Sequence, residues 1–511
     1  MAVHPECGAH VCRRAPAMTI ADVVPSATIA RERTPLRVVL AGWYGAANLG
    51  DELLLSVIAG WVREAGGVPV AISTNPGPTH AAHGIEAVGY GDLAAIVEAM
   101  AGADLFVLGG GGLFQDYDVF DAASLERFPA WTVSQYAQFM LLADELGLPT
   151  VALAQGVGPL RGAEARAIAA DIFTRAGDVS VRDRDSAALV RDIGVTRDVM
   201  VAPDPGWTWR HELQPKVALR ERYPALARQR VIAMILRDWP FDPAWEAACV
   251  EALRAAIPAG WAVLWLDFNR PPDAATSGYS EIARRMVAAL ADGRTHVIWA
   301  GTLLEEAAAL LAQCDACIAM RLHGVLLAAL AGVPVIAIEY DGKVGALCDE
   351  IGMAPAQRVG LPAIRSELAR AIAALTGANG TEVRRLAPAR VEQLGTQALA
   401  HRDLLWRAMA SAQNRSSVAP SRAEQPAWLG RWLEATPAAV SRVEAALGAR
   451  LRRHAAQSAG ATPSQAAYDA TVMPSQAAHD TAATPSQAAH DDAATQAQTA
   501  TSAAATHSGG H

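Results

Sequence analysis

A basic pair follows a short apolar run in the second half of the chain. Arg321 and His323 come directly after "ACIAM" (residues 316–320), and the helical run "GVLLAALAG" begins beside them. Helix N-termini attract anions, and an arginine adds a two-pronged donor for a carboxylate or phosphate. Histidine can move a proton near neutral pH. The pattern predicts a site for a phosphorylated acid that includes Leu322 and Gly324. The alternative is a strand-end arginine paired with an acid, and a histidine that caps a turn.

Three further cationic side chains, Arg182, Arg237 and Lys343, come at or just after the ends of predicted strands. Because the carboxyl ends of parallel strands meet at one edge of a sheet, these side chains are candidates for the same pocket. Glu339 ends the strand before Lys343 and is a candidate for a ribose hydroxyl. The alternative for Arg182 is a surface ion pair with a neighbouring aspartate such as Asp183.

A glycine-rich turn, "GWYGAANLGDELLL" (residues 42–55), separates a predicted strand from a helix. Gly45 and Gly50 allow close approach to the backbone, and the first amides of the new helix can hold an anion. We therefore expect Asn48 and Asp51 to face a ligand. A plain strand-to-helix turn, in which Asp51 caps the helix, is the alternative.

Four consecutive glycines in "LGGGGLFQD" (residues 108–116) follow another buried run. Such a run costs conformational entropy, which indicates that a ligand lies against the backbone. Asp116 is a candidate to orient a sugar hydroxyl or to act as a base. In "AQGVGPLRG", Gln155 is a polar candidate, although a structural turn explains it equally well. The glycines expected to contact the ligand are Gly110, Gly111 and Gly112.

Asp204 lies between two prolines in "VAPDPGW". The prolines place it rigidly, either on an interdomain ligand or in a linker.

Near-continuous apolar strands alternate with helical runs in two successive series, which predicts parallel sheets covered on both faces. The fold class is therefore α/β, with two Rossmann-like doubly wound domains facing a cleft. We place the N-terminal domain at 36–210, a polar, proline-containing linker at 211–229 and the C-terminal domain at 230–412, closed by a helical run near 386–412.

The two ends of the chain differ from this pattern. Residues 1–35 are expected to form a flexible arm, and 413–455 a linker and an amphipathic helix that ends in basic residues. That helix is interpreted as a surface or oligomer contact, with peripheral membrane association as the alternative. An 11-residue repeat rich in Ala, Ser, Thr and Gln predicts a disordered tail over 456–511.

Composition limits the class of protein. The chain has 511 residues and a formal net charge of −9, which argues against a nucleic-acid partner. Its six cysteines form no dense framework, so we expect a reducing, cytoplasmic compartment. Cys314 and Cys317 form a single CxxC, interpreted as core packing, and we expect no metal. No apolar run is long enough to predict a transmembrane helix.

The ordered set of motifs resembles the polysaccharide pyruvyl transferases, especially the CsaB-type enzymes of cell-wall polymers. The resemblance spans roughly residues 36–400. It is carried by "GWYGAANLGDE", "DLFVLGGGGLFQD", "AQGVGPL", "VRDRDS", "PDP", "MRLHGVLLAALAGVPVIAIEYDGKV" and "LCDEIGM". It implies a fold similar to GT-B glycosyltransferases. It also implies transfer of pyruvate from phosphoenolpyruvate, as co-substrate without a resident cofactor, to two sugar hydroxyls, forming a cyclic ketal and releasing phosphate.

By this resemblance Arg321, Leu322 and His323 bind phosphoenolpyruvate, with His323 in a catalytic role and Arg182 and Lys343 as further basic residues. Our hypothesis makes His323 the general acid, has the two arginines hold the anionic groups and has Lys343 help to expel phosphate. Asp116 or Asp51 is the candidate base.

The CsaB-type resemblance implies an acceptor that is a lipid-linked, N-acetylmannosamine-containing cell-wall precursor, whose ketal would anchor surface-layer proteins. A lipid-linked acceptor would bring the protein to the inner face of the plasma membrane. A capsular or exopolysaccharide acceptor is the alternative. Two other functions stay open: a GT-B glycosyltransferase that uses a nucleotide sugar, with Glu339 on the ribose, and a non-catalytic scaffold that presents the helix and tail.

Overall fold

The structure is a computed structural model that describes most of the chain between residues 35 and 414. The predicted arm, amphipathic helix and repeat tail fall almost entirely outside the described residues. The described ranges are 35–117, 133–209, 218–242, 244–269, 281–299, 301–377 and 385–414.

The first lobe is built on a parallel sheet in the order β3-β2-β1-β4-β6-β7-β8, and β5 pairs with β6 beside this path. The central strands are buried because helices cover both faces; Val38 to Ala41 of β1, for example, are fully inaccessible. The strands are β1 (Arg37–Ala41), β2 (Val68–Ser73), β3 (Glu86–Gly89), β4 (Leu105–Leu108), β5 (Gly111–Phe114), β6 (Thr150–Val157), β7 (Asp178–Val181) and β8 (Met200–Val201). The helices are α2 (Leu49–Glu64), α3 (Pro76–His83), α4 (Leu93–Ala101), α5 (Val133–Glu145), α6 (Ala163–Arg175) and α7 (Arg184–Asp192).

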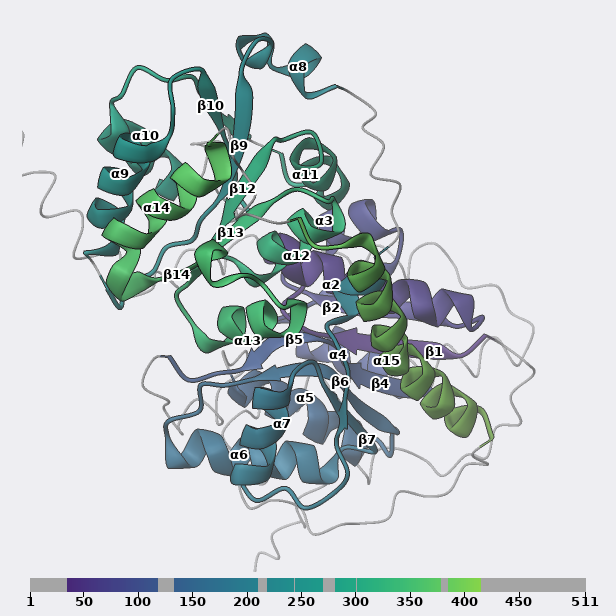
Figure 1. Ribbon diagram of the computed structural model, residues 1–511. Helices are drawn as coiled ribbons and strands as arrows, with labels where there is room; N and C mark the ends of the chain where they lie inside the picture. The colour runs from purple at the N-terminus through teal and green to yellow at the C-terminus, as the bar shows by residue number, and fades with distance from the viewer. Residues whose placement is uncertain are drawn as a thin grey trace, which may run out of the picture. The chain divides into compact units, whose positions relative to one another are not determined.

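The second lobe has a parallel sheet in the order β11-β10-β9-β12-β13-β14, again with helices on both faces (Figure 1). Its strands are β9 (Arg230–Ile235), β10 (Trp261–Leu266), β11 (His296–Trp299), β12 (Ala316–Ala319), β13 (Val335–Glu339) and β14 (Arg358–Gly360). Its helices are α9 (Trp245–Ala256), α10 (Glu281–Leu290), α11 (Leu304–Leu311), α12 (Leu322–Leu330), α13 (Gly342–Ile351) and α14 (Ile364–Thr376). Short 3₁₀ turns are η2 (Pro205–Thr208), η3 (Pro224–Leu226), η5 (Pro355–Gln357) and η6 (Leu361–Ala363).

Both sheets reverse their strand order at an internal point. In the first lobe the chain runs outward from β1 to β3 and then returns to β4 on the other side of β1. In the second lobe it runs from β9 to β11 and returns to β12 on the other side of β9. Loops at the carboxyl ends of such strands diverge and leave a crevice in which ligands bind. The turns after β1, β4, β9 and β12 are therefore the ones that the topology assigns to a site.

The predicted linker is partly ordered. Its described portion forms α8 (Leu219–Arg222) and η3, and Leu219 and Leu226 are fully buried. The amide of Leu219 donates to Oε1 of Gln313 at 2.7 Å. This portion therefore packs on the second lobe, which differs from the free connection expected over 211–229.

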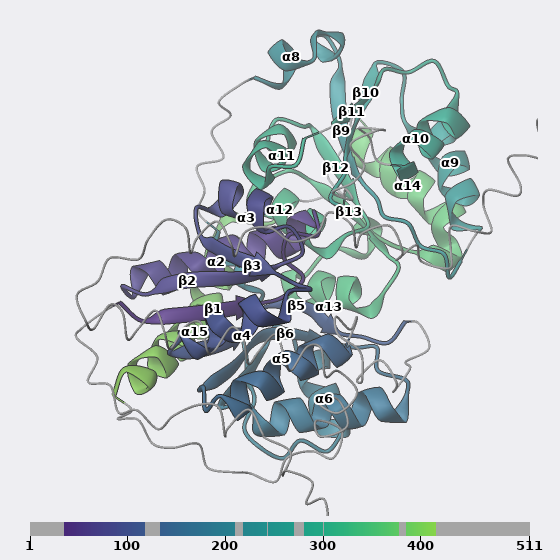
Figure 2. The ribbon, with the colours of Figure 1, turned by 180° about the vertical axis from the view of Figure 1, so that it is seen from behind.

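The last described helix, α15 (Pro388–Asn414), returns to the first lobe. It packs against β4, β6 and β7 of that sheet and against α2, as both views show (Figures 1 and 2). The indole N–H of Trp406 donates to the backbone oxygen of Trp61 at 2.9 Å. The prediction that the run near 386–412 closes the second domain is therefore wrong. Its periodicity indicated an amphipathic helix but carried no information on which sheet the apolar face covers.

His401 fastens α15 to the first sheet. Its Nδ1 lies 2.9 Å from the hydroxyl oxygen of Ser180, and its Nε2 lies 3.1 Å from the backbone oxygen of Ala202. The ring is fully buried, and burial lowers the pKa of His401 to about 4. The ring is therefore neutral at neutral pH, and Nε2–H is the tautomer that can donate to the Ala202 carbonyl.

Protonation of His401 should destabilise the protein as the pH falls. Its folded-state pKa lies below the unfolded value of about 6.5, so the unfolded state binds more protons between these values. We expect His401 alone to cost about 2 kcal/mol between pH 7 and pH 5. In urea unfolding, His401→Gln should lose that part of the pH dependence. An unchanged difference between pH 7 and pH 5 in the variant would contradict this role.

Candidate active site

A cavity of about 390 Å³ lies where loops from both lobes meet. The amide of Leu49 donates to the backbone oxygen of Phe268 at 3.0 Å, and Asn48 forms an isolated antiparallel bridge with Asn269. These contacts join the first turn of α2 to the loop after β10. Of the predicted site residues, the cavity is lined by Asn48, Gly50, Asp51, Gly112, Arg182, Arg237, Arg321, Leu322, His323 and Lys343.

Arg321 is a buried arginine at the start of α12. It caps the N-terminus of α12 through its backbone, and its side chain makes no capping hydrogen bond. Its Nε is buried and has no hydrogen-bond partner in the part of the chain that the structure describes. Burial, and then the neighbouring charge of Arg237, lower the pKa of Arg321 to about 10. An anionic ligand at this position would relieve both effects.

Arg237 and Lys343 add positive charge to the same wall through Tyr340. The guanidinium of Arg237 donates to the Tyr340 hydroxyl at 3.0 Å, and Nζ of Lys343 lies 5.5 Å from the centre of that ring. Burial alone would raise the pKa of Tyr340, but Lys343 and Arg237 hold it below its usual range. Lys343 also pairs with Asp341 at 2.9 Å. The wall thus combines two cations with a phenol that they polarise.

Arg182 enters the cavity from the carboxyl end of β7. Its guanidinium lies flat on Gly156, where a Cβ atom would come within 2.6 Å of Nη2. Only glycine permits this packing, which fixes the direction of an otherwise flexible side chain. Arg182 is 5% exposed and pairs with Asp204 at 3.3 Å and with Asp183 at 3.7 Å. The first of these pairs is buried, so the predicted alternative of a purely surface ion pair does not describe Arg182.

Asp204 links Arg182 to His323. Its Oδ2 lies 3.5 Å from Nε2 of His323, and its Oδ1 accepts the amide of Gly206 at 2.8 Å. Burial would raise the pKa of Asp204, but His323, Arg182 and the Gly206 amide together hold it well below its usual range. The carboxylate therefore stays ionised and positions a cationic side chain from β7 and a histidine from α12.

Asp51 is a buried carboxyl group in the first turn of α2. It is 7% exposed, and a Cβ atom on Gly111 would lie 2.9 Å from its Oδ1. Burial and the neighbouring Glu52 raise the pKa of Asp51 to about 7, although Arg182, Arg321 and Lys343 act in the opposite direction. A carboxyl group that titrates near neutral pH inside a cavity can take up a proton during a reaction.

The N-terminus of α2 does not offer the anion site that the sequence predicted there. The Leu49 amide is used by Phe268, and the Gly50 amide donates to the side-chain oxygen of Asn48 at 3.2 Å. The amides of Asp51 and Glu52 donate to the backbone oxygen of Asn48. The first amides of α12, at Leu322 and His323, have no acceptor within their helix and lie beside Arg321.

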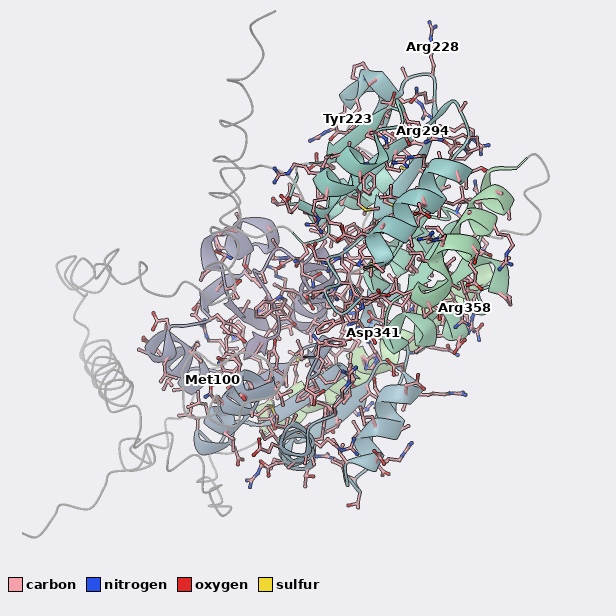
Figure 3. The ribbon with its side chains drawn as sticks, turned by 90° about the vertical axis from the view of Figure 1, so that its left-hand side faces the viewer. Met100, Tyr223, Arg228, Arg294, Asp341 and Arg358 are labelled. Atoms are coloured by element: carbon pink, nitrogen blue, oxygen red, sulfur yellow. The ribbon has the colours of Figure 1, made fainter. Side chains whose placement is uncertain are left out.

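Three predicted polar residues point away from the cavity. Asp116 accepts the amides of Arg161 and Gly162, each at 2.6 Å, and holds that loop. Gln155 is fully buried and donates to two backbone oxygens, and Glu339 pairs with Arg358. Arg358, labelled in Figure 3, is the first residue of the edge strand β14. These predictions named the right strand ends, but side-chain direction depends on the conformation of each loop.

Four predicted glycines serve packing rather than the cavity wall. Gly45 has a φ of 75°, and a Cβ atom there would lie 2.0 Å from the Ser73 hydroxyl. Gly110 packs on Leu54 and Ala154, Gly111 on Asp51, and Gly324 on Ile235 of β9. Gly50 and Gly112 do line the cavity, and Gly50 is in tight contact with His323.

Several cavity residues were not predicted. Tyr340 directly follows the predicted strand end at Glu339, but an aromatic residue there is usually interpreted as core. Trp43, Leu113 and Gln115 lie within the quoted glycine-rich motifs but were not singled out. The others, outside any quoted motif, are Tyr136, Phe268 and Asn269.

Over the described ranges, no group of three or more His, Cys, Asp or Glu residues is arranged to hold a metal ion. The four described cysteines are buried free thiols. No helix in this part of the chain is both long and apolar enough to span a bilayer.

Solved structures with a similar fold include HepE from Anabaena, in complex with UDP and glucose and in complex with UDP-glucose. The chain is 13% and 14% identical to these, with a TM-score of 0.52 in each case, over 74% of this chain and 100% of HepE. With two parallel doubly wound sheets and a cavity between their switch points, this likeness confirms the predicted GT-B-like fold.

The family model for polysaccharide pyruvyl transferase matches residues 48–342, which is more than half of the chain. The matched segment begins at Asn48, which caps α2 and lines the cavity, and it ends at the residue before Lys343. It includes Arg182, Asp204 and the Arg321–His323 motif. The chain belongs to the polysaccharide pyruvyl transferase family.

Proposed function

We propose that this protein transfers pyruvate from phosphoenolpyruvate to two hydroxyls of a sugar, forming a cyclic ketal and releasing phosphate. The observation that carries the proposal is the cationic wall around Arg321, whose Nε has no partner among the described residues. Phosphoenolpyruvate carries a carboxylate and a phosphate, so it needs at least two cationic groups. Arg182, Arg237 and Lys343 supply further charge on the same cavity.

The role that we assign to each cationic side chain follows from its chemistry. Arg321 and Arg182 hold the two anionic groups, because a guanidinium matches a carboxylate or phosphate with two parallel hydrogen bonds. Lys343 stabilises the departing phosphate as its charge develops. The α12 amides beside Arg321 add donors that a helix N-terminus supplies to an anion.

The reaction needs a general acid that protonates C3 and a general base that accepts a hydroxyl proton. His323 protonates C3 of the enol, so that C2 gains cationic character and the first sugar hydroxyl adds to it. Asp51 takes the proton of that hydroxyl. The C2–O bond to phosphate then breaks and the second hydroxyl adds to C2, losing its proton to the now neutral His323, which regains its acid form. A methyl ketal carboxylate and inorganic phosphate result, and Asp51 returns its proton to solvent. Asp204 acts as a positioning residue that holds His323 and Arg182.

The acceptor belongs to a cell-wall or surface polysaccharide or its lipid-linked precursor. A lipid-linked N-acetylmannosamine unit is the specific form that we propose, and it would place the protein at the inner face of the membrane. The nucleotide-sugar alternative required Glu339 on the ribose. Glu339 is instead paired with Arg358 and is not among the residues that line the cavity.

Phosphate release from phosphoenolpyruvate should depend on a sugar acceptor and yield a product carrying one pyruvyl ketal. His323→Ala should keep its folded structure and its stabilisation by phosphoenolpyruvate, but turn over at least about 100-fold more slowly, because a general acid is lost. Phosphate release and product mass measure this. Normal turnover by the variant would remove His323 from the mechanism.

The rate should rise with pH through about 7, because Asp51 must be ionised to accept a proton. Asp51→Asn should lower kcat and remove this rise from the pH profile. Asp116→Asn is the matched control, since its amide oxygen still accepts the loop amides, and it should keep the wild-type profile. A pH profile that changed in Asp116→Asn and not in Asp51→Asn would contradict the role of Asp51 and assign the base to Asp116.

Gly50 should be intolerant of a methyl group. A Cβ atom there would lie 2.2 Å from Nδ1 of His323, so Gly50→Ala must displace the ring, and we expect at least a tenfold fall in kcat. Gly60, later in α2, has open space around its Cβ position. Gly60→Ala should keep full activity and gain up to about 1 kcal/mol of stability. Equal activity of the two variants would show that the Gly50–His323 contact does not matter.

A further inference from the structure

A second cavity, of about 420 Å³, adjoins the proposed phosphoenolpyruvate site. The two cavities share four wall residues: Gly112, Arg182, Tyr340 and Lys343. The first contains the cationic wall around Arg321, whereas neither Arg321 nor His323 lines the second. The proposed reaction joins two substrates, so it needs a second compartment next to the anion site.

One wall of the second cavity is aromatic. Trp239 is its centre, with ring centroids 5.4 Å from Tyr117, 4.7 Å from Tyr340 and 4.9 Å from Phe241. Trp239, Tyr117 and Tyr340 line the cavity, and Phe241 extends the aromatic surface beyond them with 52% of its surface exposed. Tyr340 is buried and Trp239 and Tyr117 are partly buried, so Phe241 is the member that leaves an aromatic face open to solvent. An exposed aromatic face beside a cavity is typical of a ligand-binding surface.

The rest of the wall is rich in hydrogen-bonding groups. Asp183, Asp185 and Ser186 come from the N-terminus of α7, and Asp341 comes from the N-terminus of α13. The phenol of Tyr117 donates to Asp341, which also pairs with Lys343. A pyranose presents an apolar face of C–H groups and an edge of hydroxyls. An aromatic platform beside polar groups complements both. The three carboxylates of this cavity are balanced by Arg161, Arg182 and Lys343, so its wall has no net charge to select an anionic sugar.

Gly112 forms the boundary between the two cavities. A Cβ atom there would come no closer than 3.7 Å to the Gln115 side chain and 3.9 Å to Nη2 of Arg182. A glycine here therefore adds no side chain to the wall beside Arg182. Because Arg182 lines both cavities, a ligand that it holds in the first cavity would lie next to a molecule in the second.

We propose that the second cavity binds the acceptor as an uncharged hexopyranose unit, whose apolar face stacks on Trp239 and Phe241. This inference rests on the proposed function, since the acceptor's hydroxyls must reach C2 of phosphoenolpyruvate. It assigns recognition of the sugar to side chains outside the cationic cavity. Binding of the sugar and binding of phosphoenolpyruvate should therefore be separable by mutation.

The test measures saccharide binding directly, by titration calorimetry of the full chain with a panel of neutral hexose and N-acetylhexosamine glycosides. Phe241→Ala and Trp239→Ala should weaken binding at least tenfold, and Trp239→Tyr should restore most of it. Phe241 is half exposed, so its variant should fold even if Trp239→Ala does not. Leu303→Ala removes a similarly exposed side chain, 50% accessible, that lies outside the Trp239–Phe241–Tyr117 cluster, and should bind as wild type.

The outcomes separate the two proposals. Phosphoenolpyruvate should stabilise Phe241→Ala as much as it stabilises the wild type. If phosphoenolpyruvate did not stabilise the wild type, the proposed function would be overturned. The saccharide titration would still test the subsite in that case. Saccharide binding that is equal in Phe241→Ala, Trp239→Ala and wild type would overturn the subsite, as would no binding by any saccharide of the panel. A uridine nucleotide that binds only when Trp239 is present, without saccharide binding, would assign the aromatic wall to a base and overturn it too.

Discussion

A buried carboxylate between two basic side chains is the interaction on which the site depends. Asp204 pairs with Arg182 at 3.3 Å and lies 3.5 Å from His323, and it is 2% exposed. A buried charge is costly without partners, so the three groups stabilise one another's positions. Because Arg182 follows β7 of one lobe and His323 lies in α12 of the other, this cluster ties the chemistry to the contact between the lobes.

Sheet topology explains why these residues meet. Each lobe reverses its strand order once, and the loops at that point carry Asn48, Asp51, Arg237 and the Arg321–His323 motif. The carboxyl ends of other strands add Arg182 after β7, Phe268 after β10 and Lys343 after β13. The first amides of α2 donate within the protein, and the Gly45 amide of the preceding turn donates to the Glu52 carboxylate at 2.8 Å. The glycine-rich turn lets α2 approach His323 at Gly50 and reach the loop after β10 through Leu49. Gly50 therefore positions a catalytic candidate.

Sequence reasoning predicted the fold class and the cationic strand ends well, because both depend on local patterns. Apolar runs that alternate with helices specify parallel sheets. A charged residue directly after a buried strand must lie at the carboxyl edge of the sheet. The direction of side chains in loops was harder to predict from the sequence. Asp116 and Asp51 were both expected in the site, but Asp116 binds loop amides and Asp51 lines the cavity. The assignment of α15 to a lobe also failed, since the contacts that decide it, such as His401 with Ser180, join residues more than two hundred positions apart.

Arg321, whose Nε has no hydrogen-bond partner among the described residues, is proposed to make the cavity a site for a small dianion or trianion. The most direct measurement is a calorimetric titration of the wild-type chain and Arg321→Ala with phosphoenolpyruvate, and of the wild type with UDP-glucose. We expect phosphoenolpyruvate to bind the wild type and to bind Arg321→Ala at least tenfold more weakly, and we expect UDP-glucose not to bind the wild type. Tight binding of UDP-glucose together with no binding of phosphoenolpyruvate would contradict the account and favour a glycosyltransferase.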